Sequence, residues 1–141
     1  KDFENPENSF LHRVIERRQG LPITLSVLFI LLARRIGLEL EPIGLPGRFV
    51  VGCFGAERPF YLDAWAGGKI LEVEQMENYL QHSSVEGSGS ALLPVTVAET
   101  LARGCRNLCY HYLRAEDMKK SKMFRSFVDE FEHIRRIATN T

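Results

Sequence analysis

The chain has 141 residues, of which 45% are hydrophobic, and this predicts one domain with a substantial core rather than two large ones. Eighteen Lys and Arg residues balance eighteen Asp and Glu residues, so we expect neither nucleic acid nor an anionic membrane as a partner. The longest apolar run, Val27 to Ala33, is too short to span a bilayer, and three cysteines without the spacing of a disulfide framework favour a cytoplasmic protein.

The first part of the chain predicts two helices. Apolar residues recur at helical spacing from Pro6 to Arg18, and Gly20 is expected to end this first helix. Pro22 suits the first turn of a second helix that stops at Gly37. Because apolar side chains surround most of this second helix, we expect it to be a buried central helix.

The pattern then changes from helical periodicity to alternation. Leu38 to Ile43, Phe49 to Phe54 and Phe60 to Leu62 are bounded by Gly or Pro and predict three strands of an antiparallel sheet. Ile70 to Val73 would add an edge strand. A short helix is expected from Glu74 to Gln81.

The second part of the chain predicts a helical extension. Residues 82–90 are rich in Ser and Gly and have the composition of a flexible connector. They divide a mixed core, residues 1–81, from an extension, residues 91–141, in which two apolar stripes predict a helix pair. We expect this pair to pack on the core as an αα-hairpin.

Four ordered motifs resemble the transglutaminase-like core that is found in a group of regulator-like bacterial proteins and in some eukaryotic F-box proteins. The resemblance covers roughly Asn8 to Leu80 and implies an α+β, papain-like fold in which a central helix packs on an antiparallel sheet. The motifs are Arg18-Gln-Gly-Leu-Pro-Ile-Thr-Leu-Ser26, Ala33-Arg-Arg-Ile-Gly-Leu38, Leu45-Pro-Gly-Arg-Phe49 and Tyr61-Leu-Asp-Ala-Trp-Ala-Gly-Gly68.

The resemblance also implies where a Cys-His-Asp triad would lie in active members. The cysteine place is Pro22, the histidine place is Arg48, and only the aspartate is retained, as Asp63. Proline has no nucleophile, and arginine stays protonated near neutral pH, so it cannot accept a proton as histidine does. We therefore expect neither hydrolysis nor transamidation by this route.

The retained positions are candidates for ligand binding. Asp63 has two interpretations, an ion pair with Arg48 or a strand-end carboxylate that accepts backbone N–H groups in the turn from Ala64 to Gly68. Trp65 is either an exposed binding anchor on the rim of the degenerate cleft or a partly buried rim residue. We take Arg48, Asp63 and Trp65 as the candidate binding residues.

Other residues could supply a nucleophile. Thr24 and Ser26 lie near the helix start, but without a local base their hydroxyls are better interpreted as capping or packing groups. Cys53 is either a displaced reactive thiol or, as is usual within an apolar strand, a small buried hydrophobe.

A metal site is not expected. Cys105 and Cys109 are one helical turn apart and His111 is close in sequence, but His111 projects from a different face of the helix. No second Cys/His pair has the spacing that a zinc site requires. Core packing explains these residues better, and we predict no metal and no other cofactor.

Two functions follow from these observations. The favoured one is a non-catalytic module that binds a protein, a peptide or a small acyl ligand in a groove between the central helix and the sheet. The alternative is an active hydrolase or acyltransferase that uses Cys53 or Ser26 together with a histidine such as His12 or His82.

A third possibility is a scaffold whose helical extension docks a partner. The stripe expected to do so consists of Phe124, Phe127 and Phe131. Burial of that stripe would remove the reason for this hypothesis.

Overall fold

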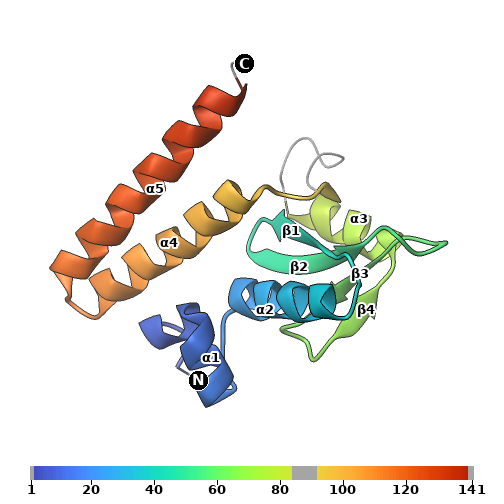
Figure 1. The fold of residues 1–141 in the computed structure, drawn as a ribbon, viewed down its shortest axis with the longest axis horizontal. Coiled ribbons are helices and arrows are strands. Elements are labelled where there is room, and N and C mark those ends of the chain that lie inside the picture. The colour runs from blue at the N-terminus through green and yellow to red at the C-terminus, as the bar shows by residue number, and fades with distance from the viewer. Residues whose placement is uncertain (1, 84–91, 140–141) are drawn as a thin grey trace. The chain divides into compact units, whose positions relative to one another are not determined.

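The computed structural model describes residues 2–83 and 92–139, which form two compact units (Figure 1). The sheet unit spans residues 25–95, and the helical unit combines residues 1–24 with residues 96–141. Residues 84–91, which hold most of the predicted connector, lie outside the described part of the chain. Each unit is described by itself, and the docking of the helix pair on the core stays a prediction.

The start of the helical unit is broken where the sequence predicted one continuous helix. A 3-10 helix, η1 (Pro6–Ser9), precedes an α-helix, α1 (Leu11–Arg17), and Phe10 between them has extended backbone. The α-helix ends at Arg17, within one residue of the predicted Arg18, and Arg18 follows as a C-cap in a left-handed conformation with φ 53°. The break falls at an apolar residue, Phe10, which fits the helical periodicity, so the sequence pattern could not reveal it.

The helical unit is completed by the predicted helix pair, α4 (Val97–Arg114) and α5 (Met118–Thr139), which form a hairpin. Leu108 and Val128 are buried in the unit. The Tyr112 and Phe124 rings stack with centroids 5.7 Å apart, and Phe10 brings the N-terminal segment against Phe124. Aromatic packing therefore joins the two ends of the chain within this unit.

The sheet unit has the expected α+β architecture. Its helices are α2 (Pro22–Arg35), which begins in the last residues of the helical unit, and α3 (Val73–His82). Between them lies a four-stranded antiparallel sheet in the order β1-β2-β3-β4. The strands are β1 (Glu41–Leu45), β2 (Arg48–Cys53), β3 (Phe60–Asp63) and β4 (Lys69–Leu71).

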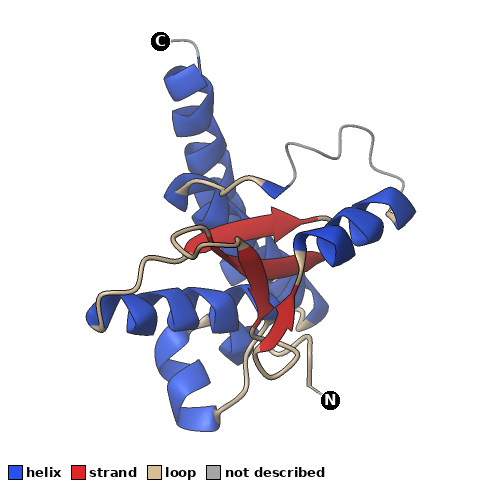
Figure 2. Ribbon diagram, turned by 90° about the vertical axis from the view of Figure 1, so that its right-hand side faces the viewer, coloured by secondary structure: helices blue, strands red, loops and turns tan. Residues whose placement is uncertain are grey.

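The two helices cover opposite faces of this sheet (Figure 2). The α3 face holds the main core cluster, which consists of Ile43, Leu45, Val50, Tyr61, Leu71, Met76 and Leu80. On the α2 face, Phe49 and Val51 are buried, and the Ser26 hydroxyl donates to the Phe49 carbonyl at 3.3 Å. Because successive side chains of a strand lie on opposite faces, alternate residues of β2 face α2 and α3.

The α2 helix is less buried than its sequence suggested. Ser26, Ile30 and Ala33 are buried, whereas Leu32 is 57% exposed and Ile36, just beyond the helix, is 76% exposed. Apolar residues surround the helix, but a sheet can cover only one side of it. The remaining apolar face of α2 is therefore open to solvent.

Candidate functional site

Arg48 and Asp63, which occupy the histidine and aspartate places of the resemblance, form an ion pair. Arg48 begins β2 and Asp63 ends β3. The Nη2 atom of Arg48 lies 2.6 Å from Oδ2 of Asp63, and Nε donates to the same oxygen at 3.1 Å. The side chain of Asp63 is 6% exposed and that of Arg48 is 27% exposed, so water and salt screen the pair less than they would at the surface.

Asp63 also satisfies its second interpretation. Its Oδ1 atom accepts the Ala66 N–H at 3.1 Å, and its carbonyl oxygen accepts the Gly68 N–H at 2.9 Å. Gly67 and Gly68 have φ values of 72° and 83°, a backbone conformation that favours glycine. One carboxylate oxygen closes the turn while the other pairs with Arg48, so both interpretations hold together.

The ion pair lies on the α3 face of the sheet. Arg48 pairs with Leu45 across the first two strands, and Asp63 is two residues beyond Tyr61. Leu45 and Tyr61 belong to the core cluster on the α3 face, and cross-strand partners and alternate residues share a face. In agreement, Cζ of Arg48 lies 5.2 Å from the centroid of the Tyr79 ring in α3, which is a cation–π distance.

This arrangement joins the ends of two strands and gives Asp63 a partner that donates hydrogen bonds but accepts none. A guanidinium has donors only, and it remains protonated in proteins. Asp63 has an arginine and a backbone amide as partners, where a triad acid would orient a histidine.

The start of α2 carries no side-chain nucleophile at its first residue, Pro22. The Thr24 hydroxyl accepts the Leu21 N–H and donates to a carbonyl of η1, both at 2.8 Å. The Ser26 hydroxyl is wholly buried and donates to the Phe49 carbonyl. The capping and packing interpretation of these two hydroxyls is confirmed.

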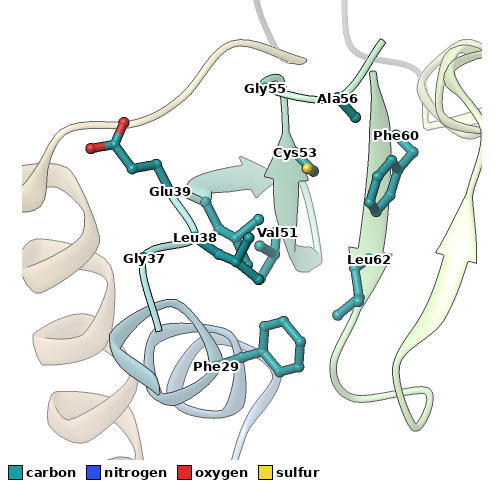
Figure 3. Close-up of a pocket in the computed structure, with 11 residues that line it drawn as sticks. Phe29, Gly37, Leu38, Glu39, Val51, Cys53, Gly55, Ala56, Phe60 and Leu62 are labelled. Carbon is teal, nitrogen blue, oxygen red and sulfur yellow. The ribbon is translucent and has the colours of Figure 1, made fainter. Parts of the chain in front are cut away.

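A pocket of about 640 Å³ lies on the α2 face of the sheet, within the sheet unit. Its walls come from α2, from the segment that follows it, and from the hairpin of β2 and β3 (Figure 3). Of the described lining residues, Glu39 alone carries a charge, and Figure 3 shows its carboxylate pointing away from the middle of the pocket. The side chains that shape the pocket include Phe29, Leu38, Val51, Cys53, Phe60 and Leu62.

Cys53 is thus half-buried in a ligand-sized pocket, and among the described residues of the sheet unit no histidine lines that pocket. His82 is the sole histidine of residues 25–95, and it belongs to α3, on the other face of the sheet. Its Nδ1 atom lies 2.7 Å from the Asn78 carbonyl oxygen of the same helix. A cysteine nucleophile needs a base within hydrogen-bond reach, and the described residues of this unit place no histidine beside Cys53.

Trp65 lies in the turn after β3 and is 46% exposed. This exposure leaves much of the indole accessible to a ligand. Its role as a binding anchor stays a prediction.

The cysteines of α4 have packing partners. Burial raises the pKa of the Cys105 thiol, and Cys109 Sγ lies 3.4 Å from the Ser121 hydroxyl. His111 is buried and packs against the rings of Phe3 and Tyr110. Among residues 2–83 and 92–139, no group of three or more His, Cys, Asp or Glu side chains is placed to hold a metal ion.

Two features of the site were missed in the sequence. Tyr79 follows Met76 by three residues, so the helical periodicity of α3 could have placed its ring on the sheet side. The sequence did predict a groove between the central helix and the sheet, but it missed two residues that line the pocket there. Leu38 and Leu40 alternate as in a strand, whereas β1 begins at Glu41.

No helix within the described ranges is both long enough and apolar enough to cross a membrane. This finding concerns residues 2–83 and 92–139 only.

The comparisons with known proteins agree with this architecture. F-box only protein 21 from Homo sapiens is 35% identical over 116 residues, which cover 76% of this chain and 18% of that protein. A UPF0162 protein from Xylella fastidiosa is 37% identical over 75 residues, covering 53% of this chain and 27% of the relative. A UPF0162 protein from Haemophilus influenzae is 26% identical over 125 residues, which cover 89% of this chain and 43% of that relative.

The chain therefore spans less than half the length of these relatives. No solved structure gives a significant match. The family model described as the transglutaminase-like superfamily matches residues 1–106, which extends the resemblance into α4. The chain belongs to the transglutaminase-like superfamily.

Proposed function

We propose that this transglutaminase-like domain binds a protein or peptide segment and performs no transglutaminase or protease chemistry. The observation that carries the proposal is the pair formed by Arg48 and Asp63, in which a permanently charged donor holds the acid that would otherwise orient a catalytic histidine. The similarity to F-box only protein 21 is compatible with a role in protein interaction. Loss of the base removes most of the rate acceleration of a triad that acts as a unit.

The pocket on the α2 face is the proposed binding site. A volume of about 640 Å³ accommodates a few apolar side chains of a peptide, and the lining is almost entirely apolar. Phe29 is 38% exposed at its wall, so part of its ring becomes buried when a ligand enters. Burial of apolar area would supply the affinity.

The binding test uses Cys53 as a reporter. In a background of Cys105→Ser and Cys109→Ser, a fluorophore on Cys53 should change its emission when a peptide from a random library occupies the pocket. Phe29→Ala should weaken the binding of every such peptide, because Phe29 lines the pocket. Leu31→Ala is the matched control, since Leu31 has a similar exposure on the same helix but does not line the pocket.

The catalytic test offers the full chain a fluorescent amine with a glutaminyl peptide, and separately a thiol ester. We expect no product above the uncatalysed rate. The rival hypothesis, a displaced nucleophile, draws on the position of Cys53 in the pocket. Product formation that is abolished by Cys53→Ser would overturn the non-catalytic assignment.

A further inference from the structure

The helical unit presents an apolar surface that is separate from the pocket. Four side chains of α5 are between 44% and 54% exposed and form what we call the α5 seam: Met123, Phe127, Ile134 and Ile137. The stripe expected from the sequence is only partly exposed, because Phe124 and Phe131 are half-buried and Phe127 alone is exposed. The exposed surface therefore differs from the predicted one.

The seam has the spacing of a coiled-coil interface. Positions 123, 127, 130, 134 and 137 are separated by four, three, four and three residues, which is the alternation of the a and d positions of a heptad. Such a stripe is narrow and follows the axis of α5. Its geometric complement is another α-helix, whose side chains can fit between those of the seam.

The α4 helix does not cover the seam. Several α5 side chains meet α4 or are buried beside it, and none of them belongs to the seam: Ser121, Phe124, Val128, Phe131, Glu132 and Arg135. The seam lies on the adjacent flank of α5. Figure 1 shows α4 running along only one side of α5.

Glu130 occupies the middle of the seam and is exposed. Its neighbours on the helix have partners, since Arg125 pairs with Asp129 and Glu132 with Arg106. Glu130 forms no ion pair with any residue that the structure describes. A carboxylate among apolar side chains favours a partner that brings a positive charge to this point.

The same carboxylate disfavours a second copy of this chain as the occupant. Glu130 has two apolar seam residues on each side. A parallel dimer through the seam would place Glu130 against its equivalent. An antiparallel dimer would place it against its equivalent or bury its carboxylate against an apolar seam residue of the other copy, which is also unfavourable. Like charges in contact within an interface are destabilising.

We propose that the α5 seam docks an amphipathic helix of a partner protein, with apolar residues against the four seam side chains and a lysine or arginine against Glu130. This surface is independent of the proposed pocket function. It assigns the chain a second interaction site, on a different unit.

The test uses two synthetic helical peptides and the full chain. Both peptides carry leucine at the four positions that would face the apolar side chains of the seam. They differ only at the position that would face Glu130, which is lysine in one peptide and glutamate in the other. Fluorescence anisotropy should show that the lysine peptide binds about tenfold or more tightly than the glutamate peptide at physiological salt. Glu130→Lys should reverse this preference, because the charge of the seam is reversed while its apolar residues are unchanged.

Phe127→Asp should abolish binding of the lysine peptide. Met118→Asp is the matched control, since Met118 is 51% exposed on α5 but lies outside the seam. Circular dichroism checks that both variants fold. Substitutions at these exposed positions should not disturb the fold. Equal binding of the two peptides, no reversal in Glu130→Lys, or a dimer in sedimentation that Phe127→Asp dissociates would each overturn the proposal.

Discussion

Arg48 and Asp63 meet diagonally across β2 and β3, with Nη2 of the arginine 2.6 Å from Oδ2 of the aspartate. The Tyr79 ring packs on the guanidinium, and the Ala66 amide binds the other carboxylate oxygen. The pair thus connects two strands, a turn and α3. At the two positions that the resemblance assigns to a histidine and an aspartate, the sheet unit holds a contact that we expect to contribute to its stability.

The ion pair should show a measurable coupling energy. A double-mutant cycle with Arg48→Met and Asp63→Asn, measured by urea unfolding, should give a coupling free energy of about 1–2 kcal/mol, because the pair is largely removed from water. The cycle for Arg125 and Asp129 provides the control, since both side chains are more than 60% exposed and the expected coupling is about 0.3–0.5 kcal/mol. Equal values for the two cycles would show that Arg48 and Asp63 behave as an ordinary surface pair.

Gly20 should be intolerant of any side chain. A Cβ atom there would lie 2.9 Å from Thr24 Oγ1 and 2.9 Å from Val14 Cγ1, and both neighbours are buried, β-branched side chains. Gly20→Ala should lower the free energy of unfolding by about 1–3 kcal/mol through overpacking. Thermal and urea unfolding of the full chain measure this loss.

Gly104→Ala is the opposite substitution in the same unit. Gly104 lies inside α4, and a Cβ atom there would meet nothing within 4 Å. Alanine should therefore raise the free energy of unfolding by about 0.5–1 kcal/mol through helix propensity. A loss at Gly104, or tolerance at Gly20, would contradict the packing described here.

The sequence could predict the structural features that depend on local signals, such as the limits of helices and strands. Pro22 and Gly37 marked the limits of α2, and alternation with turn residues located the four strands to within a few positions. The meeting of Arg48 and Asp63 was anticipated as one of two interpretations. These features follow from residue type and from positions on neighbouring strands.

Features that depend on packing across the sequence were missed. The grouping of residues 1–24 with the C-terminal helices involves contacts such as that between Phe3 and His111, which periodicity does not reveal. The open face of α2 was missed for a related reason. The composition of a helix tells which residues could be buried, but not which neighbours are present to bury them.

His111 should make stability depend on pH. Burial lowers the pKa of its imidazole, a smaller effect of the Glu4 carboxylate opposes this, and Nδ1 has no hydrogen-bond partner in the described residues. The unfolded chain therefore binds a proton more readily than the folded one. Stability should be constant above about pH 7.5 and should fall as the pH drops through the unfolded value near 6.5.

Urea unfolding between pH 5 and pH 8 measures this dependence. His111→Phe keeps an aromatic ring in contact with Phe3 and Tyr110 and should flatten the profile over that range. His133→Phe is the control, because His133 is exposed on α5. If the two variants change the profile equally, His111 is not the group responsible.

The capping box at the start of α4 should contribute at neutral pH and weaken in acid. Oγ1 of Thr96 accepts the Glu99 N–H at 3.1 Å, and Oε2 of Glu99 accepts the Thr96 N–H at 2.8 Å. Thr96→Ala should cost about 1 kcal/mol in urea unfolding. Thr100→Ala is the control, since its hydroxyl donates to the carbonyl of Thr96 four residues earlier at 2.9 Å and satisfies no free N–H group of the first turn, so its loss should cost less.

The acid dependence of this cap follows from Glu99. The hydrogen bond from the Thr96 backbone lowers the pKa of the Glu99 carboxyl below its usual 4.5. Its contribution is therefore complete above the unfolded value and is lost as the pH falls through the lower folded value. Glu99→Gln keeps an acceptor for the Thr96 N–H but cannot titrate, so it should lose less stability between pH 5 and pH 3 than the parent. An equal loss in both proteins would assign the acid dependence to other carboxylates.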